Sequence, residues 1–250
     1  MKLAQPVALI TGGASGIGLA FARHWMESGG NVVLADLGED ALARTTQDLG
    51  SGSRAVICDV TCRPAVDATV ASVEQIEGRL DAVFNSAGIA RPQPSAEITD
   101  DMFSLMLDIH VTGSMRVCRA AYPLLCRSGG SIVNVASVAA SAGMPHRASY
   151  TAAKAAIGGL TRTLAVEWGA SGVRVNAIAP GYVRTALTDA LIAEGKLADD
   201  KIRARTSLGR FADPAEIASA AYFLATSASS FVNGQVLAVD GGLGIDGNWY

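Results

Sequence analysis

Short, almost continuous runs of apolar residues alternate along the chain with longer segments in which apolar residues recur every three or four positions. The short runs occupy residues 6–11, 31–36, 54–59, 80–85, 131–137, 173–179 and 235–240. Each run is bounded by glycine, proline or aspartate, which is typical of strands buried on both faces of a parallel sheet. The segments between them, such as GLAFARHWMES and EIASAAYFLAT, have the spacing of helices with one apolar face.

Seven strands separated by helices predict an α/β protein with a doubly wound, Rossmann-type parallel sheet and helices on both faces. No linker, repeat or low-complexity stretch divides residues 1–250, so we predict a single domain. Residues 182–208 interrupt the alternation, because they are helical and charged and contain no strand. An insertion after the carboxyl end of a strand lies over the crevice in which open α/β sheets bind ligands. This segment is therefore either a substrate lid or an ordinary pair of surface helices.

The composition argues against several functional classes. Half of the 250 residues are hydrophobic, the net charge is −3 and there is no basic run, so we expect no nucleic-acid partner. No apolar stretch reaches the roughly 18 residues of a membrane span. The first residues, MKLAQPVALITGG, show no signal-peptide cleavage pattern. We therefore expect a cytoplasmic protein with no membrane partner.

The cysteines and histidines do not have the spacing of a metal site. Cys58, Cys62, Cys118 and Cys126 lack paired C-x-x-C motifs, and the three histidines are scattered along the chain. We predict buried, reduced thiols and no bound metal.

A glycine-rich segment, TGGASGIG, follows the first predicted strand directly. Gly12, Gly16 and Gly18 have the spacing G-x-x-x-G-x-G, with Ser15 and Ile17 between them. Glycines at a strand–helix junction let backbone N–H groups and the helix N-terminus approach a pyrophosphate closely. The segment therefore predicts a dinucleotide cofactor.

The second predicted strand ends in Asp36, eighteen residues after Gly18. A carboxylate at this position can accept hydrogen bonds from an adenosine ribose and repels a 2′-phosphate. The basic residues that would attract that phosphate are absent, because Ser15 lies in the loop and Leu37 follows the acid. We predict NAD(H), preferred over NADP(H).

Tyr150 and Lys154 lie four residues apart in SYTAAKAAIGGLTRTLAVEW, so a helix places both side chains on one face. A tyrosine on an apolar helix is commonly a core residue whose hydroxyl has a partner. The alternative is a tyrosine whose proton moves during a reaction.

Together these motifs resemble the short-chain dehydrogenase/reductase family over nearly the whole chain, in its NAD-preferring form. Thr11 and the three glycines match the family loop T-G-x-x-x-G-x-G, and VDGG (239–242) matches its C-terminal signature. NSAG (85–88) is similar to the family's N-N-A-G, with Ser86 replacing an asparagine. Ser137 precedes Tyr150 by thirteen residues, and PGYVRT (180–185) matches the segment beside the nicotinamide.

The resemblance implies a catalytic set of Ser137, Tyr150 and Lys154, with the lysine also binding the nicotinamide ribose. Asp59, at the end of the third strand, and Val60 are expected beside the adenine. The further cofactor contacts that it implies are Asn85, Ala87, Gly88, Pro180, Gly181, Val183 and Thr185. Members of the family are commonly tetramers, so we expect a homotetramer. The last two residues of this chain, Trp249 and Tyr250, either reach the active site of a neighbouring subunit or cap the site of their own subunit.

His110 departs from the family pattern, which usually has asparagine at this position on the long helix before the fifth strand. The backbone carbonyl of that residue is thought to hold a water molecule that relays protons toward the lysine. His110 either preserves this water with unchanged chemistry, which we favour, or adds a titratable group to the catalytic set.

Oxidation of a secondary alcohol requires a group that accepts the hydroxyl proton while the cofactor accepts the hydride. Free tyrosine has a pKa near 10, too high for a base at neutral pH. A positive charge at about 4 Å contributes about 4 kcal/mol at an effective dielectric constant of about 20, but only about 1 kcal/mol in water. Lys154 is thus expected to lower the pKa of Tyr150 in a closed, dry site. Ser137 would hydrogen-bond to the substrate oxygen.

The segments around Ser137 and after Gly181 are expected to face the substrate. We predict a small pocket of mixed apolar character that includes Ser137, Ala139, Met144, Pro145, Tyr150, Tyr182 and Leu187. His146 and Arg147 lie either at its rim or in solvent, and we favour solvent. The predicted substrate is a small polyol, sugar or hydroxy compound.

Two other functions are considered. The first is a 3-oxoacyl thioester (acyl carrier protein) reductase, against which Asp36 counts because such enzymes usually take NADPH. The second is a non-catalytic NAD-binding sensor, against which the complete set of Ser137, Tyr150 and Lys154 counts.

Overall fold

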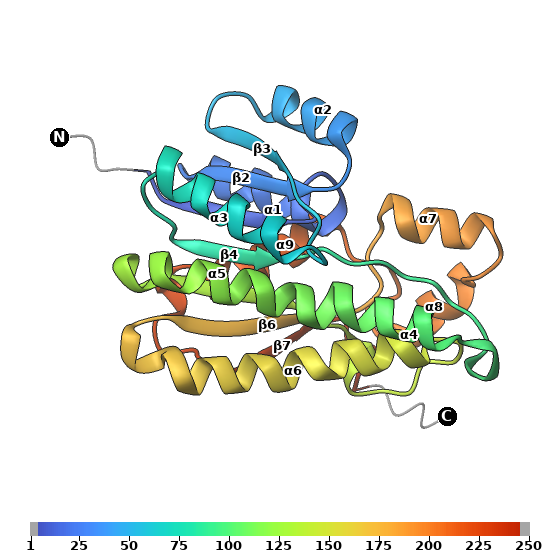
Figure 1. The fold of residues 1–250 in the computed structure, drawn as a ribbon. Coiled ribbons are helices and arrows are strands. Elements are labelled where there is room, and N and C mark those ends of the chain that lie inside the picture. The colour runs from blue at the N-terminus through green and yellow to red at the C-terminus, as the bar shows by residue number, and fades with distance from the viewer. Residues whose placement is uncertain (1–4, 246–250) are drawn as a thin grey trace.

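The computed structural model describes residues 5–245 and contains one seven-stranded, entirely parallel sheet (Figure 1). The strand order is β3-β2-β1-β4-β5-β6-β7, which confirms the predicted doubly wound fold. The strands are β1 (Val7–Thr11), β2 (Asn31–Asp36), β3 (Ser53–Ile57), β4 (Ala82–Asn85), β5 (Ser131–Val135), β6 (Arg174–Pro180) and β7 (Val236–Val239).

The order of the strands reverses between β1 and β4, which are neighbours in the sheet but far apart in the sequence. Ile10 of β1 pairs with Leu34 on one side and with Phe84 on the other. All three side chains are fully buried, as expected for strands covered on both faces. The connections after β1 and β4 leave toward opposite faces, so a crevice opens at the carboxyl ends of these two strands.

Helices cover both faces of the sheet (Figure 1). They are α1 (Gly16–Glu27), α2 (Glu39–Leu49), α3 (Arg63–Ile76), α4 (Asp100–Leu107), α5 (Gly113–Ser128), α6 (Ala148–Trp168), α7 (Ala186–Ala193), α8 (Asp199–Arg205) and α9 (Pro214–Ala225). One core cluster joins α3, α5 and α6 to the sheet, through residues such as Val70, Leu124 and Leu164. The second joins α1 and α9 to the opposite face, through residues such as Phe21 and Leu224.

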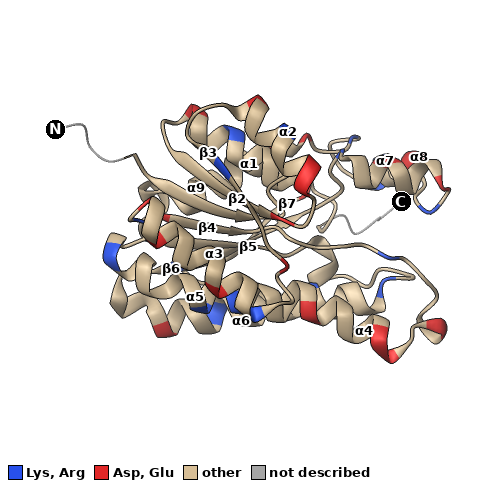
Figure 2. Cartoon of the chain, turned by 45° about the horizontal axis from the view of Figure 1, so that its top comes forward, with Lys and Arg blue, Asp and Glu red and all other residues tan. Residues whose placement is uncertain are grey.

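Charged residues lie mainly on the outer helices and loops, whereas the central strands carry almost none (Figure 2). In the described part of the chain, no helix is long and apolar enough to span a membrane. No group of three or more His, Cys, Asp or Glu residues there could hold a metal ion.

Two local expectations are wrong. The third strand ends at Ile57, so Asp59 lies in the loop that follows it and not at the strand end. The cysteines are free but not uniformly buried: Cys58 and Cys118 are buried, whereas Cys62 is exposed and Cys126 only partly buried. Cys62 is exposed because it directly precedes α3 in a surface loop.

The segment 182–208 contains α7 and α8 and extends beyond the carboxyl end of β6 (Figure 1). Its first residues are anchored, because Val183 forms a parallel bridge with Ala212 and the N–H of Ala212 donates to the Tyr182 carbonyl at 2.9 Å. The Thr185 side chain caps the N-terminus of α7. The predicted contacts of Trp249 and Tyr250 lie outside the described residues.

Candidate active site

The glycine-rich loop forms one wall of a long groove at the carboxyl ends of the central strands. Gly12 has φ +65°, and a Cβ there would lie 2.9 Å from the Ala87 nitrogen and from the Ser86 oxygen. Gly16 has φ +53°. Both positions therefore need glycine because of their backbone conformation, and Gly12 also because another backbone segment approaches it closely.

Thirteen of the residues predicted to contact the cofactor line this groove: Gly12, Ser15, Gly16, Ile17, Asp36, Leu37, Asp59, Val60, Ala87, Gly88, Tyr150, Lys154 and Thr185. They come from the ends of β1, β2, β4 and α6 and from the loops after β3 and β6. Residues from distant parts of the chain, from Gly12 to Thr185, are thus brought together by the parallel sheet, because every strand ends at the same edge.

Five predicted contacts do not line the groove. Gly18 is buried, and a Cβ there would clash with the Gly12 carbonyl oxygen, so this glycine serves close packing within the loop. Asn85 is buried and donates from Nδ2 to the Asn134 side chain at 2.9 Å, which ties β4 to β5. The other three, Pro180, Gly181 and Val183, line the adjoining cavity instead.

Asp36 is held by two backbone N–H groups at the end of β2. Its Oδ2 accepts from Ala14 at 3.1 Å and its Oδ1 accepts from Leu37 at 2.8 Å. Each carboxylate oxygen keeps a second acceptor position, so a ligand hydroxyl in the groove can still hydrogen-bond to it.

The polar group at the centre of the site consists of Ser137, Tyr150 and Lys154. Ser137 follows β5 and is buried, and its Oγ accepts from the Ala139 N–H at 3.1 Å. Tyr150 and Lys154 lie on the first turns of α6, with the lysine Nζ 5.6 Å from the centre of the tyrosine ring. Lys154 is buried, and its Nζ donates to the Val135 carbonyl at 2.7 Å. The predicted set is therefore brought together.

The electrostatics of this group differ from the expectation that Lys154 lowers the pKa of Tyr150. Burial raises the pKa of Tyr150 above 10, and the neighbouring Ser137 hydroxyl and Arg147 are the groups that lower it. Burial also lowers the pKa of Lys154 to about 7. A lysine with this pKa is uncharged in the pH range in which the phenol would ionise by itself, so its charge can act on the tyrosine only if the two groups titrate together.

His110 lies in a π-helical turn (Asp108–Thr112) that joins α4 to α5. Its ring is buried, with Nε2 2.9 Å from the Ile89 carbonyl oxygen and 3.2 Å from the Ile89 nitrogen. Its Nδ1 has no hydrogen-bond partner among the described residues. Burial, followed by the charge of Lys154, lowers the pKa of His110 to about 3. The imidazole is therefore neutral at physiological pH, which favours a packing role over a proton-carrying one.

A smaller cavity of about 160 Å³ adjoins the groove, and Tyr150 lines both. Of the predicted substrate residues, Ser137, Met144, Tyr150, Tyr182 and Leu187 line this cavity. Ala139 does not: it is buried, whereas its neighbour Val138 lines the cavity. Pro145 and His146 are exposed and also outside the lining.

The location of Arg147 is the main correction, because this residue lines the cavity and is only partly exposed. Sequence reasoning also missed Thr188, Leu191 and Leu197, which reach the cavity from α7 and the turn after it. Their apolar spacing within 182–208 was the available signal. In the groove the missed residues include Ile89 and Ala90, which directly follow the NSAG motif.

Comparison with known proteins yields matches along nearly the whole chain. A family model described as Enoyl-(Acyl carrier protein) reductase matches residues 12–244. The chain is 42% identical to cis-4-hydroxycyclohexanecarboxylate dehydrogenase of Sinomonas cyclohexanicum, with 96% of each chain covered. It is 40% identical to galactitol 2-dehydrogenase (L-tagatose-forming) of Cereibacter sphaeroides, again with 96% of each covered.

A third relative is 3-oxoacyl-(acyl-carrier-protein) reductase of Thermotoga maritima, which is 35% identical over 97% of this chain and 99% of its own. Among solved structures, an actinorhodin polyketide ketoreductase with NADPH superposes with a TM-score of 0.92 at 32% identity. The superposition covers 97% of this chain and 98% of that one.

Proposed function

Because the chain belongs to the short-chain dehydrogenase/reductase family, we propose that it transfers a hydride between NAD(H) and a secondary alcohol or ketone, with Tyr150 as general acid/base. The observation that carries this proposal is the position of Tyr150 between the two hollows. Its ring lines the long groove, which suits a dinucleotide, and also the small cavity, which suits a substrate.

The groove fits a dinucleotide in its shape and in its chemistry. Gly12 and Gly16 have positive φ and carry no side chains, so a ligand can approach the loop backbone at the N-terminus of α1. Helix N-termini favour phosphate groups. Asp36, Asp59 and Lys154 line the same groove and would hold the hydroxyl groups of a dinucleotide. When bound, the nicotinamide supplies the hydride acceptor or donor.

Tyr150 would accept the hydroxyl proton of the alcohol during oxidation and return it during reduction. This requires an accessible phenolate, which burial disfavours and Ser137 and Arg147 favour. A negative phenolate would in turn favour the protonated form of Lys154, because opposite charges about 4–6 Å apart stabilise each other. The two residues would then titrate as a coupled pair. Ser137 would orient the substrate oxygen toward the tyrosine.

Asp36 supports NAD(H) over NADP(H), because its carboxylate lies in the groove and would repel a 2′-phosphate. A solved relative of the same fold contains NADPH, so the fold by itself does not exclude NADP(H). Initial rates with both cofactors at equal concentration test the preference. Equal or better efficiency with NADP(H) contradicts it.

The cavity supports a small hydroxy compound as the substrate. Its volume of about 160 Å³ and its many apolar lining residues leave few partners for the several hydroxyls of a polyol. Cyclic hydroxy acids such as cis-4-hydroxycyclohexanecarboxylate are thus better candidates than galactitol, although dehydrogenases of both occur among the relatives. Leu187, Leu191 and Leu197 reach the cavity from the 182–208 segment, which supports its role as a substrate lid.

The family model and the Thermotoga maritima relative favour a second candidate, a 3-oxoacyl thioester reductase. One screen distinguishes the two functions. The protein is mixed with NAD⁺ and cyclic hydroxy acids, polyols or 3-hydroxyacyl thioesters, and NADH absorbance is followed for wild type and Tyr150→Phe. Turnover of hydroxy acids that is lost in the variant supports the main proposal, whereas turnover of thioesters alone supports the second. NADH binding by Tyr150→Phe without wild-type turnover of any compound favours a binding-only protein.

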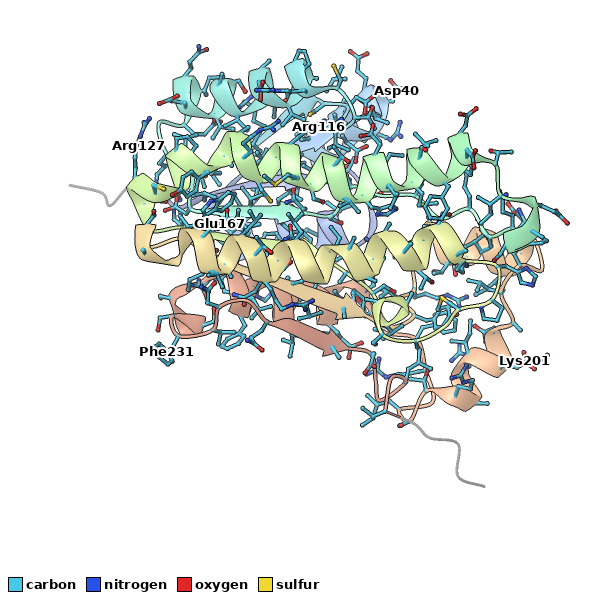
Figure 3. All side chains as sticks on the ribbon, turned by 60° about the horizontal axis from the view of Figure 1, so that its bottom comes forward. Asp40, Arg116, Arg127, Glu167, Lys201 and Phe231 are labelled. Atoms are coloured by element: carbon cyan, nitrogen blue, oxygen red, sulfur yellow. The ribbon has the colours of Figure 1, made fainter. Side chains whose placement is uncertain are left out.

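We also propose that the protein is a cytoplasmic homotetramer. Apolar side chains are exposed on the outer surface, including Val166 of α6 (84% exposed) and Leu237 of the edge strand β7 (38% exposed). Figure 3 shows Phe231 projecting away from the molecule. Light scattering of the purified protein measures the oligomeric state.

A further inference from the structure

Most acidic side chains of the segment 182–208 form salt bridges with basic side chains of the same segment. Arg184 pairs with Asp189 and Asp199, at 2.6 and 3.0 Å. Arg203 also pairs with Asp199, at 2.6 Å. Lys196 pairs with Glu194 at 2.7 Å. These carboxylates therefore already have cationic partners.

Arg147 differs from these arginines, because its guanidinium forms no hydrogen bond or salt bridge with any described residue; only its backbone carbonyl accepts a hydrogen bond, from the N–H of Thr151. It is also the only charged residue in the described lining of the cavity, which contains no aspartate or glutamate. A partly buried guanidinium without a carboxylate partner creates a positive potential in the cavity. The cavity is thus electrostatically suited to an anion.

The backbone around Arg147 increases this positive potential. Arg147 is the residue immediately before α6, which has 21 residues and no acidic residue in its first turn. A cation is unfavourable at a helix N-terminus, where the helix dipole is already positive. The preceding residue, His146, has φ +62°, a conformation uncommon outside glycine. An anion in the cavity would offset the charge of Arg147 and the positive end of the helix dipole of α6.

Arg147 lines the same cavity as Ser137 and Tyr150. Arg147 lowers the pKa of Tyr150 and that of Tyr182, so its charge acts on both phenols. Much of the remaining lining is apolar and includes Val138, Met144 and Leu191. The cavity therefore combines a phenol, a cation and a hydrocarbon surface.

We propose that Arg147 binds the carboxylate of a substrate whose secondary hydroxyl faces Tyr150 and whose hydrocarbon part contacts the apolar lining. This inference rests on the proposed dehydrogenase function and narrows its substrate class to hydroxy carboxylates. The guanidinium can bind both carboxylate oxygens through parallel hydrogen bonds. Polyols lack the anion, and the phosphate-bearing carrier of an acyl thioester would place its charge outside a cavity of this size.

Binding of two non-reacting ligands tests the inference without depending on turnover. Cyclohexanecarboxylate and its neutral isostere cyclohexanecarboxamide are titrated by calorimetry into the full-length protein saturated with NADH. We expect the carboxylate to bind wild type roughly ten- to a hundredfold more tightly, as for a charge-assisted pair. Arg147→Met should remove this preference and leave carboxamide affinity within about twofold. Arg147→Lys should retain part of it, because the charge remains.

Arg162→Met is the matched control, because Arg162 is exposed on the same helix and does not line the cavity. It should bind both ligands as wild type does. Equal affinity of wild type for the two ligands, or no measurable carboxylate binding, overturns the inference even if Arg147→Met does not fold. An unchanged preference in folded Arg147→Met overturns it as well. If the inference is overturned, Tyr150-dependent turnover of neutral alcohols by the wild-type protein would still support the proposed dehydrogenase function. Carboxylate selectivity without any turnover would instead contradict that function alone.

Discussion

The imidazole ring of His110 lies edge-on to the phenol ring of Tyr150, with the ring centres 5.6 Å apart and the ring planes at 90°. The same imidazole packs against Gly88, where a Cβ would overlap the ring. His110 thus connects the floor of the groove to the tyrosine. Its neutrality at physiological pH follows from this burial, since a charged ring would lose its hydration.

The burial of His110 predicts a pH-dependent loss of stability. Its pKa falls from 6.5 to about 3 on folding, so below pH 6.5 the unfolded chain binds a proton that the native protein does not. Stability is therefore lost as the pH falls from 6.5 toward 3. Between about pH 7 and about pH 5 this group alone should lower the free energy of unfolding by about 2 kcal/mol. In urea unfolding, the loss of unfolding free energy between these two pH values should be smaller in His110→Asn than in wild type, by about 2 kcal/mol. An equal loss in both proteins would contradict this account.

Lys154 is predicted to set the pH dependence of turnover through the charge pair described above. A full charge 5.6 Å from the ring centre is worth about 3 kcal/mol at an effective dielectric constant of about 20, or about two pH units. Lys154→Met should therefore move the acid limb of the kcat/KM profile upward by about two pH units. Lys154→Arg keeps the charge and should move it much less. A limb that stays in place in the methionine variant would show that the lysine does not tune the tyrosine.

Gly12 is predicted to be irreplaceable for cofactor binding. Gly12→Ala adds a methyl group 2.9 Å from two backbone atoms of the β4 loop, so the groove wall must shift. We expect dinucleotide affinity to fall at least roughly tenfold. Gly29→Ala is the matched control, because Gly29 also has a positive φ but no atom within 4 Å of the added Cβ. It should cost about 1–2 kcal/mol of stability and leave affinity, measured by NADH fluorescence, unchanged.

Asp36 is predicted to control the choice between the two dinucleotides. Asp36→Asn removes the charge and keeps an acceptor oxygen for only one of the two backbone N–H groups, those of Ala14 and Leu37, that the carboxylate binds. The ratio of kcat/KM for NAD⁺ to that for NADP⁺ should fall at least roughly tenfold, chiefly through a lower KM for NADP⁺. Asp40→Asn, which removes an exposed charge from the next helix, should leave the ratio unchanged. A ratio unaffected by Asp36→Asn would mean that other residues exclude the 2′-phosphate.

Several features of the fold and the site could be predicted because they depend on local sequence. Apolar runs located all seven strands to within about two residues, since a strand buried on both faces must be apolar along its length. The glycine spacing located the groove wall, because a positive φ and a close backbone approach at Gly12 exclude other residues. The helical spacing of Tyr150 and Lys154 placed both on one face of α6.

The resemblance to a family also assigned cofactor contacts to residues that do not line the groove. Gly18 and Asn85 match the family motifs, yet Gly18 packs against the backbone of Gly12 and the Asn85 side chain hydrogen-bonds to Asn134, which links β4 to β5. A motif reports that a residue type is needed at a position. It does not distinguish contact with a ligand from support of the backbone that makes the contact.

The sequence by itself determined the order and type of the elements and the residues at the strand ends, because these follow from periodicity and from backbone conformations that few residues adopt. Only the tertiary structure decided how the side chains at those ends act on one another. The unpaired guanidinium of Arg147 in the cavity, the Val135 carbonyl that holds Lys154 and the dry surroundings of His110 all involve segments distant in the chain. Burial and charge pairing depend on those distant neighbours, and no local pattern of residues contains them.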